Sequence, residues 1–266
     1  PVLAISGSNG KTTTKELIAA ALSKKFNTLY TLGNYNNHIG VPLTLLRINQ
    51  QHELAIIEMG ANHQGEIAFL CQIAAPNYGM LTNIGKAHLE GFGGEEGVRK
   101  GKTEMFKYID EHKGTLFINL DDPKIKVSVP KNINSITYSI KESANYKGTL
   151  LETHPRLVGT WESNSQSGQI NSALYGAYNF HNILAAWSIA SYFGVKASDI
   201  DDAINTYESD MNRSQLVKKL GAEIYLDAYN ANPSSMSLSL ENFEKVKASK
   251  KVAILGDMFE LGDDAA

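Results

Sequence analysis

Residues 6–14 read Ser6-Gly7-Ser8-Asn9-Gly10-Lys11-Thr12-Thr13-Thr14 and follow directly on an apolar run at residues 1–5. The apolar run predicts a strand and the residues after the loop predict an amphipathic helix. In a loop between such elements, backbone N–H groups and the helix N-terminus attract phosphate. Lys11 would reach the β- and γ-phosphates, and the Thr12 hydroxyl would bind Mg²⁺. The stretch therefore predicts a nucleoside triphosphate site.

One position departs from the usual phosphate-loop pattern, Gly-x-x-x-x-Gly-Lys-[Ser/Thr]. The first glycine of that pattern falls at position 5, where this chain has Ile5. A Gly-Lys-Thr triplet alone occurs often by chance, and the alternative is an ordinary strand-to-helix turn. Its place between a strand and a helix favours phosphate binding.

Composition limits the other classes of function. The 266 residues are 42% hydrophobic, enough to bury a large core in one or two domains. The net charge of −3, without a long basic run, argues against a nucleic-acid partner. Cys71 is the one cysteine, which we interpret as a buried helical residue in a cytoplasmic protein. No run approaches the roughly 20 apolar residues of a membrane span. Both ends of the chain are interpreted as cuts through a longer protein.

Strands and helices alternate along most of the chain. Strands are expected at residues 2–6, 54–59, 79–84 and 115–119, with helices at 11–25, 65–74 and 95–109. This alternation predicts a parallel sheet with right-handed crossovers. Residues 135–175 predict a small antiparallel patch, followed by helices at 180–193 and 199–207. After Arg213 the alternation restarts with a strand at 223–227, a helix at 234–247 and a strand at 251–255.

The expected fold class is therefore α/β. It combines a P-loop-type, mostly parallel sheet and flanking helices with a small antiparallel patch, followed by the start of a second Rossmann-like α/β domain. The expected domains are residues 1–213, which would bind ATP, and residues 214–266, part of a second domain.

Further candidate residues follow the expected strands. Glu58 ends a buried strand, and the carboxyl ends of parallel strands line the ligand crevice, so its carboxylate could bind Mg²⁺. The alternative is a solvated strand-end glutamate. Asn37 belongs to an amide-rich segment that is either an elaborate turn or an anion site. His88 follows another strand, where a lone histidine is more often structural. The cations of residues 99–102 could equally form a solvated helix face, and residues 121–123 need only be a turn.

Together these motifs resemble the Mur ligase family over essentially the whole chain. The motifs are residues 6–14, Gly-Asn-Tyr-Asn-Asn-His-Ile-Gly-Val-Pro at 33–42, Glu-Met-Gly-Ala-Asn at 58–62, Asn-Ile-Gly-Lys-Ala-His-Leu-Glu-Gly-Phe-Gly at 83–93, Asp-Ala-Tyr-Asn-Ala-Asn-Pro at 227–233 and Leu-Gly-Asp-Met-Phe-Glu-Leu-Gly at 255–262. Within the family they are most similar to the branch that adds D-alanyl-D-alanine to UDP-N-acetylmuramoyl-tripeptide in peptidoglycan synthesis. The resemblance implies a central ligase domain, part of a C-terminal domain, and a monomer.

The resemblance also implies roles for individual residues. The implied nucleotide contacts are Ser8, Asn9, Gly10, Lys11, Thr12, Thr13, Asn37, Asn179, Asn182, Arg213 and Asp227. Among these, Asn179 and Asn182 would lie near the adenine, Arg213 at a phosphate and Asp227 at the ribose. The implied Mg²⁺ ligands are Thr12, Glu58, His88 and Lys102, with His88 and a carbamylated Lys102 serving a second ion. Lys11, Glu58, His88 and Lys102 form the implied catalytic group.

The implied reaction has two steps. ATP phosphorylates the terminal carboxylate of the tripeptide, and the amine of D-alanyl-D-alanine then displaces phosphate from the acyl phosphate. No protein nucleophile is needed, because the site works by positioning and by charge neutralisation.

Two departures and several alternatives accompany this interpretation. The family usually has Gly-x-His-Asn where this chain has Gly-Ala-Tyr-Asn at 176–179, which leaves the adenine contacts open. The family's UDP-sugar-binding domain does not precede Pro1, so the chain alone is expected to be a poor ligase. A sister amino-acid ligase or a folylpolyglutamate synthase-like enzyme shares the ATP apparatus. A GTPase-like switch would need an Asn-Lys-x-Asp motif, which is absent, and a non-catalytic nucleotide-binding module is the remaining alternative.

Overall fold

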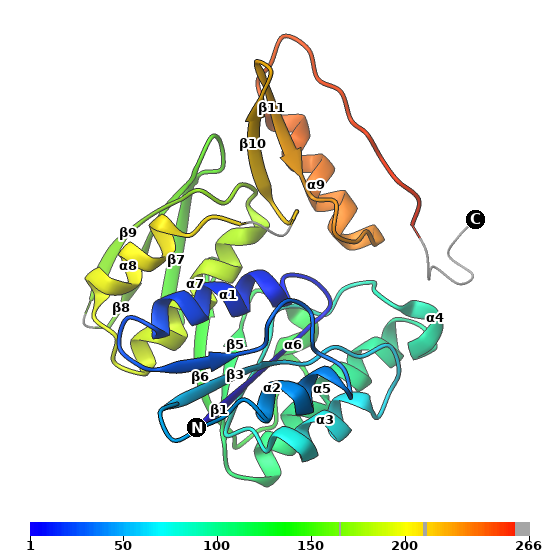
Figure 1. The fold of residues 1–266 in the computed structure, drawn as a ribbon, viewed down its shortest axis with the longest axis vertical. Coiled ribbons are helices and arrows are strands. Elements are labelled where there is room, and N and C mark those ends of the chain that lie inside the picture. The colour runs from blue at the N-terminus through cyan, green and yellow to red at the C-terminus, as the bar shows by residue number, and fades with distance from the viewer. Residues whose placement is uncertain (165, 210–211, 259–266) are drawn as a thin grey trace.

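The computed structural model describes residues 1–164, 166–209 and 212–258 (Figure 1). Within these residues the main sheet has nine strands in the order β2-β3-β1-β4-β5-β6-β7-β8-β9, and β10 and β11 form a separate hairpin. The strands are β1 (Val2–Ser6), β2 (Thr28–Tyr30), β3 (Leu54–Glu58), β4 (Tyr78–Leu81), β5 (Thr115–Asn119), β6 (Asn134–Ser139), β7 (Tyr146–Glu152), β8 (Leu157–Ser163), β9 (Ser167–Ser172), β10 (Gln215–Lys219) and β11 (Ala222–Leu226). The helices are α1 (Lys11–Leu22), α2 (Gly40–Leu45), α3 (Glu66–Ala74), α4 (Leu89–Phe92), α5 (Glu95–Glu111), α6 (Pro123–Lys126), α7 (Tyr178–Tyr192), α8 (Ala197–Thr206) and α9 (Pro233–Lys245).

The parallel half of the sheet brings the expected motifs to one edge. Strand β1 lies between β3 and β4 and is parallel to both, with Ile5 opposite Glu58 and Ser6 opposite Leu81. The loop after β1 therefore leaves the sheet between the ends of β3 and β4. This is the crevice at the carboxyl ends of parallel strands, where ligands bind in open α/β sheets.

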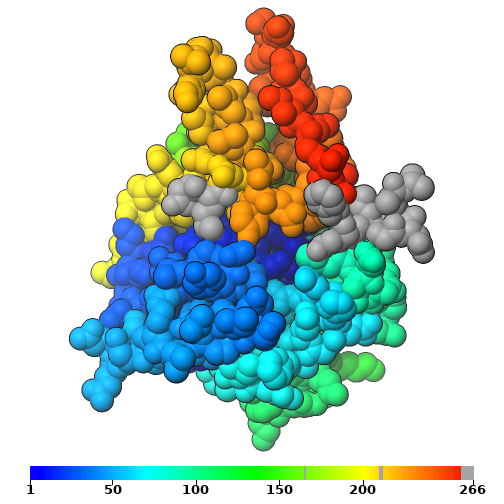
Figure 2. Space-filling view, turned by 45° about the vertical axis from the view of Figure 1, so that its right-hand side comes forward, coloured from blue at the N-terminus to red at the C-terminus, as the bar shows by residue number. Residues whose placement is uncertain are grey.

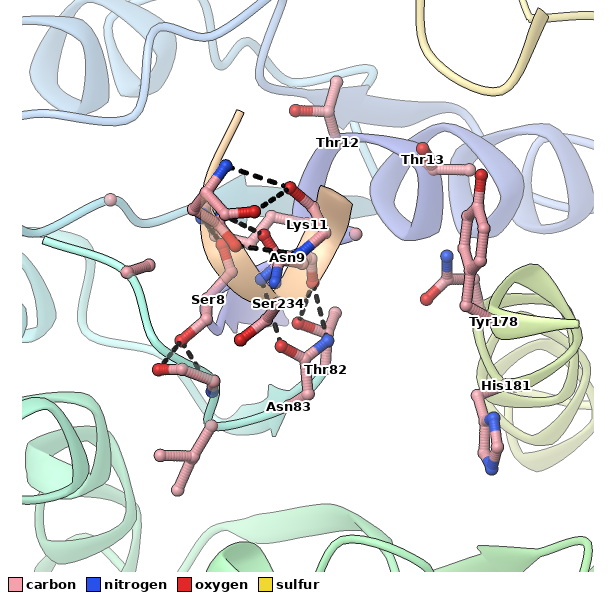
Figure 3. Close-up of a pocket in the computed structure, with 18 of the residues that line it drawn as sticks. Ser8, Asn9, Lys11, Thr12, Thr13, Thr82, Asn83, Tyr178, His181 and Ser234 are labelled. Carbon is pink, nitrogen blue, oxygen red and sulfur yellow. Dashed lines mark hydrogen bonds between the residues drawn. The ribbon is translucent and has the colours of Figure 1, made fainter. Parts of the chain in front are cut away.

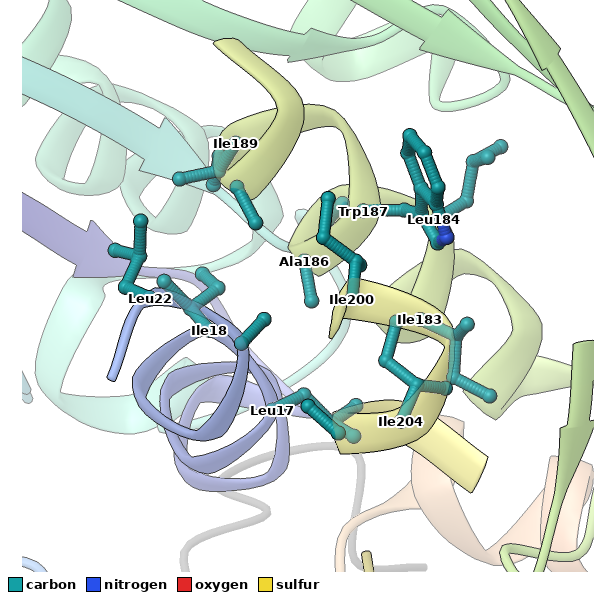
Figure 4. Packing of buried hydrophobic residues seen from close by; sticks show 14 of the residues in the cluster. Leu17, Ile18, Leu22, Ile183, Leu184, Ala186, Trp187, Ile189, Ile200 and Ile204 are labelled. Carbon is teal, nitrogen blue, oxygen red and sulfur yellow. The ribbon is translucent and has the colours of Figure 1, made fainter. Parts of the chain in front are cut away.

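Helices cover both faces of the sheet with two apolar cores. On one face α1, α7 and α8 pack together through residues such as Leu17, Ile183 and Ile200 (Figure 4). On the other face α3 and α5 pack against β3 and β4, and this core includes Cys71, as expected for a buried helical cysteine. Burial raises the pKa of the Cys71 thiol to about 12. Two-sided coverage explains why β3 is apolar without alternation.

The antiparallel patch is smaller than residues 135–175. Strands β7, β8 and β9 pair antiparallel as expected, but β6 extends the parallel sheet by pairing with β5 from Thr115 opposite Asn134. The expectation for this segment is wrong at β6, because β6 pairs parallel with both of its neighbours, β5 and β7, so the antiparallel pairing begins only between β7 and β8.

The C-terminal part differs more from expectation. The strand expected at 223–227 forms as β11, but it pairs antiparallel with β10, which was not expected. The strand expected at 251–255 does not form: residues 251–258 are extended without a sheet partner, and Ile254 is 94% exposed. The apolar run there has no neighbouring strand in the described chain to complete its hydrogen bonds. Residues 259–262 of the motif at 255–262 lie outside the described residues.

The C-terminal part stands over the N-terminal loop (Figure 2). Asn232 Nδ2 donates to Asn9 Oδ1 of that loop at 2.6 Å, and the Lys86 N–H, in the segment after β4, donates to Ser234 Oγ at 2.9 Å. None of the helices built from the described residues combines the length and the apolar content that a membrane crossing requires.

Candidate active site

The loop between β1 and α1 is held in one conformation by the end of β4. The backbone of Gly7 has φ +136°, and a Cβ there would lie 2.0 Å from Thr82 Oγ1. Thr82 Oγ1 donates to the Asn9 carbonyl at 2.6 Å, and the Asn9 N–H donates to Asn83 Oδ1 at 3.1 Å (Figure 3). Only glycine fits at position 7, since both the positive φ and the close approach exclude a side chain.

Lys11 folds back over this loop from the first turn of α1. Its Nζ donates to the carbonyls of Gly7 at 2.8 Å and Ser8 at 3.1 Å. Burial lowers the pKa of Lys11, while the charge of Glu58 opposes that effect. The ammonium group is thus held against the loop, close to the N-terminus of α1. Both the ammonium and the helix N-terminus would stabilise an anionic phosphate bound there.

Thr12 and Glu58 meet across the loop. Thr12 Oγ1 donates to Glu58 Oε1 at 3.2 Å, and Asn36 Nδ2 donates to the same oxygen at 2.7 Å. The other carboxylate oxygen, Oε2, is buried without a hydrogen-bond partner among the described residues, and Lys15 Nζ lies 3.8 Å from it. An orphaned buried carboxylate oxygen beside a hydroxyl is a donor set that suits Mg²⁺.

No group of three His, Cys, Asp or Glu side chains in the described ranges could hold a metal ion unaided. This agrees with Mg²⁺ chemistry, because Mg²⁺ in nucleotide sites takes one or two protein ligands and completes its shell with phosphate oxygens and water.

Lys102 lies behind the pocket. Its side chain is buried, Nζ donates to the Ala61 carbonyl at 3.0 Å, and the Phe92 ring centroid is 5.1 Å away. Desolvation, and then the charge of Lys11, hold the pKa of Lys102 well below its usual value. Lys100 is exposed on the same helix, so only Lys102 of this pair faces inward. Ala61 lines the pocket, which puts Lys102 one residue from it.

A single cavity of about 940 Å³ joins these parts. Every candidate residue of the sequence analysis except Lys102 lines it. His88 does so from a left-handed turn at φ +53° after β4, and Asn37 does so while its side-chain oxygen caps the start of α2. Asn182 lies against the loop, because a Cβ on Gly10 would come within 2.8 Å of its Oδ1. The buried Asn179 side chain is turned inward, because its Nδ2 donates at 2.8 Å to the carbonyl of Tyr175, just before α7.

The C-terminal part closes the cavity through the segment after residue 212. Tyr178 OH lies 2.9 Å from Ser214 Oγ and 3.3 Å from Asp227 Oδ2. Desolvation raises the pKa of Asp227. The Arg213 guanidinium stacks on Tyr229, 3.5 Å from the ring centroid. The buried Nε atom of Arg213 has no hydrogen-bond partner among the described residues. Arg213 and Asp227 therefore reach the same cavity as the phosphate loop.

Sequence analysis missed two charged residues, Lys15 beside the pocket and Asp121 in its wall. Lys15 is a buried cation that donates to the Thr31 carbonyl at 2.6 Å and to the Gly33 carbonyl at 3.1 Å, so it holds the segment that carries Asn36. Nothing local distinguishes it from a surface lysine. Asp121 could have been found, because it follows β5 at the same sheet edge as Glu58. Asp122 does make the expected turn, capping α6 by accepting from the N–H groups of Lys124 and Ile125.

Two family models match the sequence. The Mur ligase middle domain matches residues 5–190, and the Mur ligase, glutamate ligase domain matches residues 212–266. The chain belongs to the Mur ligase family. The first match alone covers more than half of this Mur ligase, including the phosphate loop, Glu58, His88, Lys102 and both asparagines of α7.

Relatives and solved structures resemble this Mur ligase over nearly its whole length. It is 34% identical to the UDP-N-acetylmuramoyl-tripeptide–D-alanyl-D-alanine ligase of Bacillus subtilis and 35% identical to that of Escherichia coli, over 98% and 99% of the chain. It spans 57% and 59% of those proteins. A crystal structure of MurF from Acinetobacter baumannii superposes with TM-score 0.90 at 33% identity, covering 98% of this chain and 58% of that one. MurF from Thermotoga maritima in complex with ADP gives 0.87 at 30% identity, covering 98% and 61%.

Proposed function

We propose that this Mur ligase is the ATP-dependent ligase that joins D-alanyl-D-alanine to UDP-N-acetylmuramoyl-tripeptide. The carrying observation is that Thr12 and Glu58, a hydrogen-bonded pair, line one cavity with the loop that carries Lys11, and that Glu58 Oε2 has no hydrogen-bond partner among the described residues. A phosphate-binding loop and a Mg²⁺-competent carboxylate at one crevice suit phosphoryl transfer. The names of the relatives support the choice of substrates, and the Thermotoga maritima complex with ADP supports the nucleotide.

The nucleotide would lie along the cavity from the phosphate loop to the C-terminal part. Ser8, Asn9, Gly10, Lys11, Thr12 and Thr13 would surround the phosphates, with Asn37 beside the γ-phosphate, Arg213 at a phosphate, Asp227 at the ribose, and Asn179 and Asn182 toward the base. The inward turn of Asn179 makes Asn182 the better candidate for direct contact, since its side chain also lies against Gly10.

The proposed Mg²⁺ ligands include the Thr12 hydroxyl and the Glu58 carboxylate, which form a hydrogen bond with each other. Thr12 and Glu58 would hold one Mg²⁺, and His88 with a carbamylated Lys102 would hold a second. Mg²⁺, when bound, neutralises the charge that develops on the transferring phosphoryl group. CO₂ reacts with a neutral amine, and the burial that lowers the pKa of Lys102 favours that form. Lys102 would have to leave the Ala61 carbonyl for its carbamate to reach the cavity.

The chain's own residues would act by positioning. The tripeptide carboxylate forms a bond to the γ-phosphorus as the bond to ADP breaks, which gives an acyl phosphate. The amine of D-alanyl-D-alanine then attacks the acyl carbon, and the tetrahedral intermediate expels phosphate while the amine loses a proton to solvent. Lys11 and the N-terminus of α1 would stabilise the phosphoryl charge in both steps. Closure of the C-terminal part over the cavity would exclude water from the acyl phosphate.

Other aspects of the proposal concern the whole protein. We place the domain boundary between residues 213 and 214, where the chain passes from Arg213 into the β10–β11 hairpin. We further propose a cytoplasmic monomer without a nucleic-acid partner.

The test is phosphate release by the intact protein with Mg·ATP and UDP-N-acetylmuramoyl-tripeptide. Release that requires D-alanyl-D-alanine is the expected result. Release with glutamate or another single amino acid would instead make the protein a sister ligase. No release with any acceptor would favour a non-catalytic nucleotide-binding module. Lys11→Ala should abolish release, while the exposed Lys100→Ala should not change it.

A further inference from the structure

His181 and Asp121, which the proposed reaction does not use, meet in the wall of the cavity. His181 Nε2, on α7, lies 3.0 Å from Asp121 Oδ2, which follows β5. Both residues line the cavity, and the His181 side chain is 27% exposed while that of Asp121 is 3% exposed. The imidazole is therefore the more accessible of the two groups to a ligand in the cavity.

Asp121 is fixed by its neighbours, so it fixes the imidazole in turn. Its Oδ1 accepts from Ser139 Oγ at 2.6 Å, and its Oδ2 accepts from the Ile140 N–H at 2.7 Å. A carboxylate with this many donors is held ionised and can only accept from the ring. Nε2 therefore donates to Asp121, and when the ring carries this proton alone, Nδ1 is an acceptor.

Ser139, Asp121 and His181 do not form a nucleophilic triad. In a triad the histidine bonds the serine hydroxyl and the carboxylate bonds the other ring nitrogen. Here the buried Ser139 hydroxyl and the His181 ring bind separate oxygens of Asp121, so the ring cannot activate the hydroxyl. The arrangement orients the imidazole and supplies no nucleophile.

The position of His181 relates it to the nucleotide. Tyr178, His181 and Asn182 are three and four residues apart on α7, so they share one helix face. Tyr178 reaches the segment that carries Asp227, and Asn182 touches Gly10 of the phosphate loop. Figure 3 shows the side chains of Tyr178 and His181 on the side of α7 that faces the pocket, with the Tyr178 ring directed toward Thr13 and the His181 ring directed away from it.

Apolar side chains complete this part of the cavity. Ile140, whose N–H binds the same Asp121 oxygen as His181, lines it, as do Ile84 and Pro123. Ile84 is tied to the adjacent Asp122, because its N–H donates to Asp122 Oδ2 at 2.9 Å. An apolar lining with few polar groups suits a flat ligand with polar edges, and one ring nitrogen of His181 is available to such an edge.

We propose that His181, oriented by Asp121, contacts the nucleotide base and selects a purine with an exocyclic 6-amino group. The inference rests on the proposed binding of ATP and names the residue that recognises its base. An Nδ1 acceptor pairs with the 6-amino donor of adenine, and it faces the 6-oxo acceptor of hypoxanthine or guanine without a hydrogen. Tyr178 is not assigned this role, because its hydroxyl already binds Ser214 and Asp227 of the C-terminal part.

The test compares dissociation constants for Mg·ADP and Mg·IDP, which differ at the 6-position of the base. Measurements use the intact protein and its His181→Ala and His181→Phe variants. Phenylalanine keeps a flat ring but no acceptor, so it separates hydrogen bonding from shape. We expect the wild type to prefer ADP, and both variants to lose that preference by about 2- to 12-fold, the range of one hydrogen bond. His112→Ala is the matched control, because His112 is an exposed residue at the end of α5.

Two results would overturn the inference and they are distinguishable. If both variants bind ADP and IDP with the wild-type ratio, His181 does not read the base, although the proposed function stands. If the wild type binds neither nucleotide, the proposed function fails and this inference fails with it. Circular dichroism melting of each variant establishes that the compared proteins are folded.

Discussion

Asn232 Nδ2 donates to Asn9 Oδ1 at 2.6 Å, so the residue that caps α9 also binds the phosphate loop 223 residues earlier in the chain. The same side chain accepts from the Ser235 N–H at 2.9 Å in a capping box. Asn232 thus links the position of the C-terminal part to the conformation of the loop that would hold phosphate.

Replacing Asn232 should separate its two contacts. Serine is as good an N-cap as asparagine but too short to reach Asn9, so Asn232→Ser should keep α9 stable and weaken Mg·ADP binding several-fold. Asn232→Ala should lose the cap as well, at a cost of about 1 kcal/mol in unfolding free energy. Isothermal titration and urea unfolding measure the two effects. Wild-type affinity in Asn232→Ser would show that the contact is incidental.

Tyr178→Phe should weaken nucleotide binding without unfolding the protein. The substitution removes the hydroxyl that lies 3.3 Å from Asp227 and leaves the ring in place. We expect KM for ATP to rise by about 2- to 12-fold, the range of one hydrogen bond, with a smaller change in kcat. Tyr146→Phe is the matched control, since its hydroxyl binds Ser191 at 3.1 Å outside the cavity. If both variants changed KM for ATP equally, Tyr178 would not act through its contact with Asp227.

Lys102 should be the lysine that forms a carbamate. Because burial lowers its pKa, a larger fraction of the amine is neutral near pH 7 than for an exposed lysine. In ¹³C-bicarbonate, NMR should show a carbamate signal that disappears in Lys102→Ala and persists in Lys100→Ala. Ligase activity should fall at least about 100-fold in Lys102→Ala, if the carbamate serves the metal. A signal that survives in Lys102→Ala would assign the modification elsewhere.

Asp121 should make the protein sensitive to acid. Hydrogen bonds from His181, Ser139 and the Ile140 N–H overcome desolvation and hold the pKa of Asp121 well below its usual value. A lowered folded-state pKa means stability that is complete above the unfolded value of about 4 and is lost as pH falls toward the folded value. Urea unfolding should therefore show Asp121→Asn less stable than wild type by about 1–3 kcal/mol at pH 7. The difference should shrink below about pH 4, and a difference that grows there would refute the assignment.

Local rules were enough to place the loop at residues 6–14 between a strand and a helix and to find β1, β3, β4 and β5, although they missed the short strand β2. The loop at residues 6–14 needs glycines, a lysine and a threonine in order, and its N–H groups bind phosphate wherever such a loop joins a strand to a helix. Glu58 was found by the same kind of rule, because a buried parallel strand ends at the ligand edge of its sheet. These features depend on neighbours in the chain, so the order of residues is sufficient to find them.

The pairing of the strands was harder to predict from the sequence. Strand β6 joins the parallel sheet rather than the antiparallel patch, β10 was not expected, and residues 251–255 form no strand despite their apolar composition. A strand exists only where another strand supplies its hydrogen bonds, and that partner is set by the whole fold. An apolar run is therefore necessary for such strands but does not decide whether they form.

The choice among like residues also needed the folded chain. Lys100 and Lys102 look alike in composition, and only packing buries one of them behind Ala61. His181 and Asp121 are 60 residues apart, and neither pattern alone pointed to the other. Desolvation and hydrogen bonding between distant segments create the properties of these groups. The residue order of this Mur ligase was thus enough to place the loop at residues 6–14 between a strand and a helix, whereas the partners of its buried charges are set by contacts that form only when the sheet, α7 and the C-terminal part come together.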